Sequence, residues 1–251
     1  MKRWRGLILP ALLLAAAEIA GRAAGPSDTI APPSAVAVAL AAALADGSMV
    51  TATRDTLLSA FAGLTIGAAV GMALGVLFGA VRAIDRLMEL GVELMRPIPS
   101  VAVLPIALVA LGFGYPLEIV IVSFACLWPL LVLSRAAVRG VEPRLIEVAR
   151  ALRLSPWARV VKIVVPAALP RIFVAFRLAA GISLVVAVTV EIAVNPMGLG
   201  YAIMTAGQAL RPDVMLAYLL WIGVVGFALN TLLIAAQYRL FGRAARHAEE
   251  P

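Results

Sequence analysis

The sequence predicts an all-α membrane protein with about six transmembrane helices. Of the 251 residues, 63% are hydrophobic and only 14% are charged, against roughly a quarter in soluble domains. The hydrophobic residues gather into long runs with few charges, as a helix of about 20 residues needs in order to cross a bilayer. We expect spans at about residues 7–24, 57–81, 98–114, 117–138, 172–194 and 214–238.

The distribution of positive charge predicts the orientation of these spans. With the N-terminus on the cytoplasmic side, only Arg22, Arg54 and Arg211 of the 21 Lys and Arg residues fall on the outer side. Cytoplasmic loops of membrane proteins carry an excess of Lys and Arg, so both termini are expected in the cytoplasm. The net charge of +7 is thereby explained by orientation, and a nucleic-acid partner is not expected.

Residues 1–50 are expected to hold the first transmembrane helix and a short outer helix. Basic residues before a short apolar run are also typical of a cleavable signal peptide, which is the alternative for this segment. Pro32-Pro33-Ser34 predicts the start of the outer helix, and Asp46-Gly47-Ser48 predicts its end. We expect this helix to lie at the periplasmic membrane surface, with a re-entrant segment as the alternative.

Glycines recur at every fourth position of the second expected span. At this spacing they form a stripe along one face, and small residues on such a face let a second helix approach closely in lipid. We expect the stripe to serve internal helix packing, and a face that slides during function is the alternative. The stripe consists of Gly63, Gly67, Gly71, Gly75 and Gly79.

The sequence lacks the motifs of ATP-hydrolysing enzymes and of zinc enzymes. A GxxxxGK[ST] phosphate loop is absent, since the only lysines are Lys2 and Lys162 and neither follows a glycine. The single histidine, His247, cannot form an HExxH motif or a multi-histidine zinc site. The single cysteine, Cys126, is expected to be a small buried hydrophobe. We therefore expect no catalytic residue, no metal and no cofactor bound by this chain.

Three glutamates lie within or close to the expected spans. Carboxylates inside a membrane are costly and are often functional. Glu18 and Glu118 fall near span ends, where we expect them to be solvated. Glu191 is deeper in its segment, and we expect either a hydrogen-bonded structural role or a place at the outer end of a substrate path.

One segment, EVARALRLSPWARVVKIVVPAALP (147–170), is charged and jointed although it lies between apolar runs. Upstream of it, Glu142 and Pro143 suit the first turn of a helix, and the residues up to Leu154 are mostly good helix formers. Ser155-Pro156 then predicts a turn and the start of a second helix, which we expect to end before Pro166. Two short helices with a sharp turn would make a knob on the cytoplasmic side, which favours docking to a partner over a plain solvated loop.

This knob resembles the EAA loop of bacterial ABC-importer permeases. The family pattern is roughly E-A-A-x-x-x-G, nine residues, then I-x-L-P, and this sequence has EVARALR, nine residues, then IVVP. Val148 and Val165 are conservative changes, whereas Arg153 stands where the family has glycine. The stretches MRPIPSVAVLPIALVALGFGYP (95–116) and EIAVNPMGLGYAIMTA (191–206) resemble the nitrate, sulfonate and taurine branch of these permeases. The resemblance covers roughly residues 50–240.

The resemblance implies the type I ABC-importer permease architecture in the bacterial inner membrane. A permease core would occupy residues 51–245, with a cytoplasmic coupling loop at 139–170, and residues 246–251 would form a cytoplasmic tail. The implied partners are a second, identical permease subunit, two cytoplasmic ATPase subunits that bind ATP and Mg, and a periplasmic binding protein. That protein would deliver a small solute, expected to be an anion such as a sulfonate, taurine or nitrate. The chain itself would not be an enzyme.

Two sets of residues follow from the resemblance as candidates for function. The residues expected to dock the ATPase or to shape the knob are Glu147, Ala149, Arg150, Arg153, Leu154, Ser155, Pro156 and Trp157. The candidates for the solute path are Glu191, Asn195 and Tyr201.

Two other classes of membrane protein are the alternatives. An ion-coupled secondary transporter would need a midplane ion site, usually built from carboxylates or broken helices, and the expected central spans carry almost no charge. A structural or assembly protein would suit the glycine stripe. Co-purification of an ATPase subunit is expected only for an ABC-importer permease.

Overall fold

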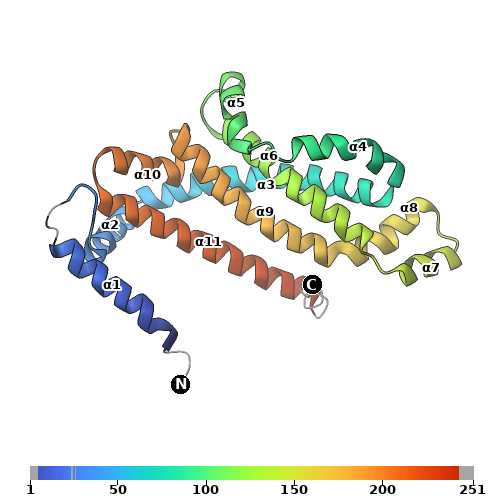
Figure 1. The fold of residues 1–251 in the computed structure, drawn as a ribbon, viewed down its shortest axis with the longest axis horizontal. Coiled ribbons are helices and arrows are strands. Elements are labelled where there is room, and N and C mark those ends of the chain that lie inside the picture. The colour runs from blue at the N-terminus through green and yellow to red at the C-terminus, as the bar shows by residue number, and fades with distance from the viewer. Residues whose placement is uncertain (1–4, 24, 26, 243–251) are drawn as a thin grey trace.

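The structure, a computed structural model, describes residues 5–23, 25 and 27–242, and this range is helical without any strand (Figure 1). The elements in chain order are α1 (Arg5–Ala23), α2 (Pro33–Ala45), α3 (Ser48–Ala80), α4 (Arg82–Met95), the 3-10 helix η1 (Ser100–Val103), α5 (Leu104–Leu111), α6 (Tyr115–Arg139), α7 (Pro143–Ala151), α8 (Pro156–Arg159), the π-helical turn η2 (Val160–Val164), α9 (Val165–Ala193), α10 (Gly198–Gln208) and α11 (Pro212–Phe241). The expected tail at 246–251 lies outside the described residues.

Four helical segments of the described chain are long and apolar enough to cross a membrane: α3, α6, Pro156–Ala193 and α11. A fifth candidate is a broken span, in which α4 and the segment Ser100–Leu111 meet at an angle of 81°. The prediction of a simple span at 98–114 is therefore wrong. Pro97 and Pro99 lack the N–H groups that a continuous helix needs, and they restrict the residues before them. The crossing of the first predicted span, within α1, stays a prediction.

The centre of the bundle consists of α3, α6 and α9, which pack side by side along their lengths (Figure 1). The glycine stripe of α3 lies against α6. At Gly71, an added Cβ atom would lie 2.6 Å from the backbone oxygen of Leu127, and Gly67 and Gly75 come equally close to backbone oxygens of α6. No side chain fits at such a distance, so glycine lets the two backbones touch along this face.

The helices α2 and α11 flank this centre. The predicted outer helix is present as α2, which packs against α11 and α1. Glu18 of α1 accepts hydrogen bonds from the Ser34 N–H at 2.9 Å and from the Ser34 hydroxyl at 2.7 Å, and so holds the first turn of α2. In α11, only 6% of the most apolar window is buried inside the chain, so this helix offers its surface to lipid or to another subunit.

The second helix of the knob does not end before Pro166, so this part of the sequence interpretation is wrong. The helix runs from Pro156 through Pro166 and Pro170 to Ala193. The π-helical turn Val160–Val164 lies directly before Pro166, and the Val165 N–H binds the backbone oxygen of Val160. This wider turn accommodates a ring that would clash with the preceding turn of a regular α-helix.

Candidate functional site

The turn of the charged loop is formed by Arg153, at the position where the related pattern has glycine. Helix α7 ends at Ala151, and Arg153 has a φ of 51°, in the left-handed region. The Leu154 N–H binds the oxygen of Ala149 at 3.1 Å, and the Arg153 N–H binds the oxygen of Arg150 at 2.9 Å. These two bonds form a Schellman motif, which usually has glycine at its left-handed position.

The second helix begins at Ser155, as the sequence predicted. The Ser155 hydroxyl accepts a hydrogen bond from the Ala158 N–H at 3.3 Å, and Pro156 occupies the first helical position. A serine followed by proline is a favourable helix start, because the serine hydroxyl accepts a hydrogen bond from a free backbone N–H and proline has no N–H that needs an acceptor. Two features therefore fix the turn: the Schellman motif at Arg153 and the helix start at Ser155-Pro156. Only the Schellman motif has an unfavourable residue, since Arg153 stands where glycine is preferred.

The tip of the loop exposes apolar and charged side chains together. Trp157 is 76% exposed, Leu152 is 64% exposed and Val148 is 50% exposed. Ala149, in contrast, is fully buried, so it lies on the side of α7 that faces the protein. Of the eight predicted docking residues, six are exposed, namely Glu147, Arg150, Arg153, Ser155, Pro156 and Trp157, while Leu154 is half-buried.

The foot of the loop is anchored to the helical bundle. Ile146 and Val141 pack against a buried cluster that includes Val138 and Val164. The Arg171 guanidinium also donates a hydrogen bond to the backbone oxygen of Gly140 at 3.1 Å. An exposed apolar tip on a fixed foot is a surface that can transmit a push from a partner to α6 and α9.

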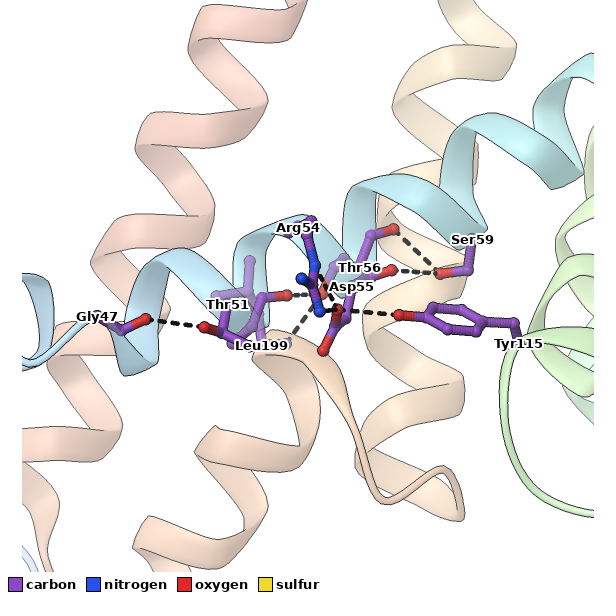
Figure 2. A network of polar contacts seen from close by, with 9 residues as sticks. Gly47, Thr51, Arg54, Asp55, Thr56, Ser59, Tyr115 and Leu199 are labelled. Atoms are coloured by element: carbon purple, nitrogen blue, oxygen red, sulfur yellow. Dashed lines mark hydrogen bonds and ion pairs between the residues drawn. The ribbon is translucent and has the colours of Figure 1, made fainter.

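At the opposite end of the bundle, polar side chains of α3 contact two other helices (Figure 2). Asp55 lies between Arg54 and Tyr115, whose hydroxyl donates to the Asp55 carboxylate at 2.9 Å. The neighbouring Thr56 hydroxyl oxygen accepts a hydrogen bond from the Leu199 N–H at 2.9 Å. The start of α3 is thereby tied to α6 and to α10.

Glu118 is fully buried, so the expectation of a solvated position is wrong. It lies in the first turn of α6 and faces the bundle, where the hydroxyl of Ser59 donates to one carboxylate oxygen. The Asn195 amide donates to the other oxygen at 2.8 Å, and the Asn195 amide oxygen accepts from the Gly114 N–H at 2.8 Å. A carboxyl group buried at a helix start is tolerated because these donors replace water.

Glu191 is also fully buried, and it fixes the start of α10. One carboxylate oxygen accepts a hydrogen bond from the Gly200 N–H at 2.7 Å. Gly198 has a φ of 84°, and a Cβ atom there would overlap the Glu191 carboxylate, while a Cβ at Gly200 would lie 2.8 Å from the Glu191 Cβ. The Gly-Leu-Gly sequence therefore allows a helix N-terminus to meet a buried carboxylate.

The three solute-path candidates are placed close along the chain but differ in exposure. Glu191 and Asn195 are fully buried with hydrogen-bond partners, and Tyr201 is half-buried. Their part in a solute path stays a prediction. The burial of Glu118 was missed, because its partners Ser59 and Asn195 are far away in sequence and no local pattern signals the contacts. Among the described residues, no group of three or more His, Cys, Asp or Glu side chains could hold a metal ion.

Comparison with known proteins gives consistent matches. Residues 67–247 match the family described as binding-protein-dependent transport system inner membrane component. The chain is 34% identical to a putative ABC transporter permease protein of Methanocaldococcus jannaschii, over 74% of this chain and 70% of that protein. It is 28% identical to a putative aliphatic sulfonates transport permease protein of Bacillus subtilis, over 88% of this chain and 81% of the relative. It is 32% identical to a taurine transport system permease protein of Escherichia coli, over 73% of this chain and 66% of that protein.

A solved structure has the same fold. A chain of the MetNI methionine ABC transporter in an inward-facing conformation superimposes with a TM-score of 0.66 at 22% identity, over 78% of this chain and 94% of that chain. These matches agree with the ABC-importer interpretation and not with the ion-coupled or structural alternatives. The chain therefore belongs to the family of binding-protein-dependent transport permeases: it is a multi-pass membrane permease subunit of an ABC importer and not an enzyme, since ATP hydrolysis in this family belongs to a separate subunit.

Proposed function

We propose that two copies of this chain form a pathway for a small anion across the bacterial inner membrane. A periplasmic binding protein delivers the anion at the end that holds α10, and two ATPase subunits that carry ATP and Mg bind at the loop end. The termini lie on the cytoplasmic side, as the distribution of Lys and Arg predicts. Closure of the ATPases moves the loop, and the loop moves α6 and α9.

The observation that carries this proposal is the geometry of the loop at 139–170. Its tip exposes Trp157, Leu152 and Val148, and its foot is held by packing and by the Arg171 bond to Gly140. Large apolar side chains beside arginines are typical of the centre of protein interfaces. A tip without a partner would leave this apolar surface in water, so the loop supports docking by the exposed members of the eight residues named above, while the buried Ala149 helps to shape the loop.

The solute class rests on the relatives. Proteins with similar sequences are named for transport of aliphatic sulfonates and of taurine, which carry an anionic sulfonate group, and others are named for the anions bicarbonate and nitrate. We propose that Glu191, Asn195 and Tyr201 belong to the outer end of the path. The buried cluster, by which we mean the fully buried side chains of Ser59, Glu118, Glu191 and Asn195, keeps this end shut. Uptake of labelled taurine, an alkanesulfonate and nitrate into proteoliposomes with the binding protein tests the class, and uptake of none of them contradicts it.

The docking assignment is tested by Glu147→Arg in the complete importer. Glu147 is exposed on α7, so reversal of its charge is expected to disturb the ATPase contact without harming the fold. ATP hydrolysis stimulated by loaded binding protein should fall to the unstimulated rate, while the chain remains in the membrane. The matched control is Glu142→Arg, at a helix start where the side chain makes no capping hydrogen bond. Stimulated hydrolysis that survives Glu147→Arg would overturn the docking assignment.

A further inference from the structure

We propose that this chain binds an anionic phospholipid at the loop end of the bundle, with the phosphate in an arginine-lined cavity and an acyl chain in the adjoining groove. The proposal concerns a ligand other than the transported solute, and it does not depend on which solute is carried. It rests on a cavity, on the charges that line it and on a second, apolar hollow that shares its wall.

The cavity lies where the end of α3, the start of α4, the end of α6 and the docking loop come together, at the right of Figure 1. Its volume is about 840 Å³. Two acidic side chains line it, Asp85 and Glu89. The basic side chains in its wall are Arg82, Arg86, Arg135, Arg139, Arg150 and Arg159.

The acidic side chains are already occupied by two of these arginines. Asp85 is buried and pairs with Arg135 at 2.6 Å and with Arg139, and Glu89 pairs with Arg135 at 3.1 Å. Within the part of the chain that the structure describes, no ion pair is recorded for Arg82, Arg86, Arg150 or Arg159.

The wall therefore keeps an excess of positive charge around a hollow large enough for a phosphate head group. Guanidinium groups match the geometry of phosphate oxygens. The buried Asp85 holds Arg135 and Arg139 in place, so part of the wall is preorganised. These features indicate a phosphate-bearing ligand, which could be a lipid or a free anion.

The neighbouring groove decides between these two sources. A second hollow of about 810 Å³ lies between α3 and α9, and it shares Ala80, Arg159 and Val160 with the arginine-lined cavity. Apart from Arg159, its lining is apolar, and Trp157 lines it at the loop. A phosphate site that opens into an apolar groove between two membrane helices fits a ligand with an anionic head and a hydrocarbon tail.

Helix α4 supports a location at the level of the lipid head groups. Asp85 and Val92 are its buried residues, while Leu87, Leu90 and Leu94 are 75%, 67% and 65% exposed. The outward leucines can contact the acyl chains of lipid, while Arg82 and Arg86 in the first turns of α4 line the cavity at the loop end of the bundle. Arginines at the end of a bundle of apolar spans lie where phospholipid head groups are available.

The ligand would also contact the docking loop. Arg150 lines the cavity and Trp157 lines the groove, and both belong to the residues proposed to meet the ATPase. A bound anionic lipid would thus join α3, α4 and the loop into one unit. Coupling between ATP hydrolysis and transport is then expected to depend on the anionic lipid content of the membrane.

Native mass spectrometry of the full-length chain in a neutral detergent tests the proposal. The probes are phosphatidylglycerol, phosphatidylcholine with the same acyl chains, and inorganic phosphate. We expect preferential binding of phosphatidylglycerol. Because each basic residue near an anionic lipid is worth roughly a factor of five, Arg82→Gln with Arg86→Gln should weaken this binding by about 30-fold. The control pair is Arg144→Gln with Arg239→Gln, which removes equal charge outside the cavity.

Each alternative result overturns the proposal. Equal affinity for the two lipids would mean that the cavity does not recognise the anionic head group. Binding of inorganic phosphate as tight as that of phosphatidylglycerol would mean that the groove contributes nothing. An equal loss in the control pair would mean that net charge alone attracts the lipid. If the double variant is not monodisperse, Arg86→Gln alone is expected to weaken binding about fivefold, and unchanged binding would reject the site.

Discussion

The two ends of the helical bundle use polar residues in opposite ways. At the end that holds α10, Glu118, Glu191 and Asn195 are fully buried and bind groups of the same chain. At the loop end, Arg150 and Arg153 are exposed, and beside them Trp157 is 76% exposed. The α10 end is closed by internal hydrogen bonds, whereas the docking loop at the other end presents side chains that its own chain does not use.

This difference distinguishes polar residues that stabilise the fold from polar residues that bind a partner, a distinction that sequence composition alone does not make. A buried polar group with internal partners fixes the geometry of the segments that it joins, and its removal leaves those partners without a bond. An exposed group without an internal partner contributes little to folding, so its removal is expected to change binding and not stability. The following substitutions test this separation.

The largest effect is expected where the helices that connect the two ends touch. In Gly71→Leu, the first side-chain atom would lie 2.6 Å from the backbone oxygen of Leu127, so α3 and α6 must move apart. Such overpacking costs about 1–3 kcal/mol or more, and we expect the chain to be lost from the membrane fraction or to aggregate in detergent. Size-exclusion chromatography of the purified protein measures this.

The control for this change is Gly223→Leu on α11, where an added Cβ atom would meet nothing within 4 Å. It adds the same side chain to another membrane helix, and we expect normal yield and a monodisperse peak. Similar behaviour of the two variants would show that the glycine stripe is not needed for close packing.

The helices themselves could be predicted from hydropathy because long apolar runs have few other solutions in a bilayer. The stripe of glycines also predicted a close helix contact, since the four-residue period places them on one face. The breaks were harder to predict. Pro97 and Pro99 produced a bend of 81°, whereas Pro166 and Pro170 left a continuous helix. Whether a proline bends a helix depends on its neighbours in space, and these are absent from a single sequence.

The next largest effect is expected from Glu191→Leu at the closed end. This change removes the acceptor of the Gly200 N–H and leaves a buried donor without a partner, which costs about 1–3 kcal/mol. We expect a lower midpoint of thermal unfolding in detergent. Glu147→Leu is the matched control at the loop end, where the side chain is exposed, and it should unfold at the wild-type temperature. An unchanged midpoint for Glu191→Leu would contradict the structural role of the buried cluster.

The docking loop could be recognised from its sequence, whereas the buried cluster could not. The loop is local: its helix starts, its turn and its exposed Trp157 all lie within some 30 residues, and the pattern itself resembles a family motif. The cluster joins Ser59, Glu118 and Asn195 from three separate segments, and Glu118 looked solvated because it lies near a span end. Only the packing of α3 and of α9 against α6 brings its partners within reach.

The smallest effect is expected at two left-handed residues, one at each end of the molecule. Arg153 ends α7 with a φ of 51° and Leu210 ends α10 with a φ of 54°. A residue other than glycine in this conformation costs roughly 1–2 kcal/mol, and glycine loses about 0.5–1 kcal/mol more chain entropy on folding. Arg153→Gly and Leu210→Gly should therefore each stabilise the protein slightly, by up to about 1 kcal/mol, in thermal unfolding.

The two variants are expected to differ in binding. Arg153→Gly removes an exposed guanidinium from the tip of the docking loop, so the affinity for the ATPase subunit should fall severalfold although the fold is more stable. Leu210→Gly should gain the same stability and bind the ATPase like the wild type, because it lies at the opposite end. If Arg153→Gly binds the ATPase unchanged, the arginine in the glycine position has no docking role. An equal loss of ATPase affinity in both variants would mean that docking is not confined to the loop end of the bundle.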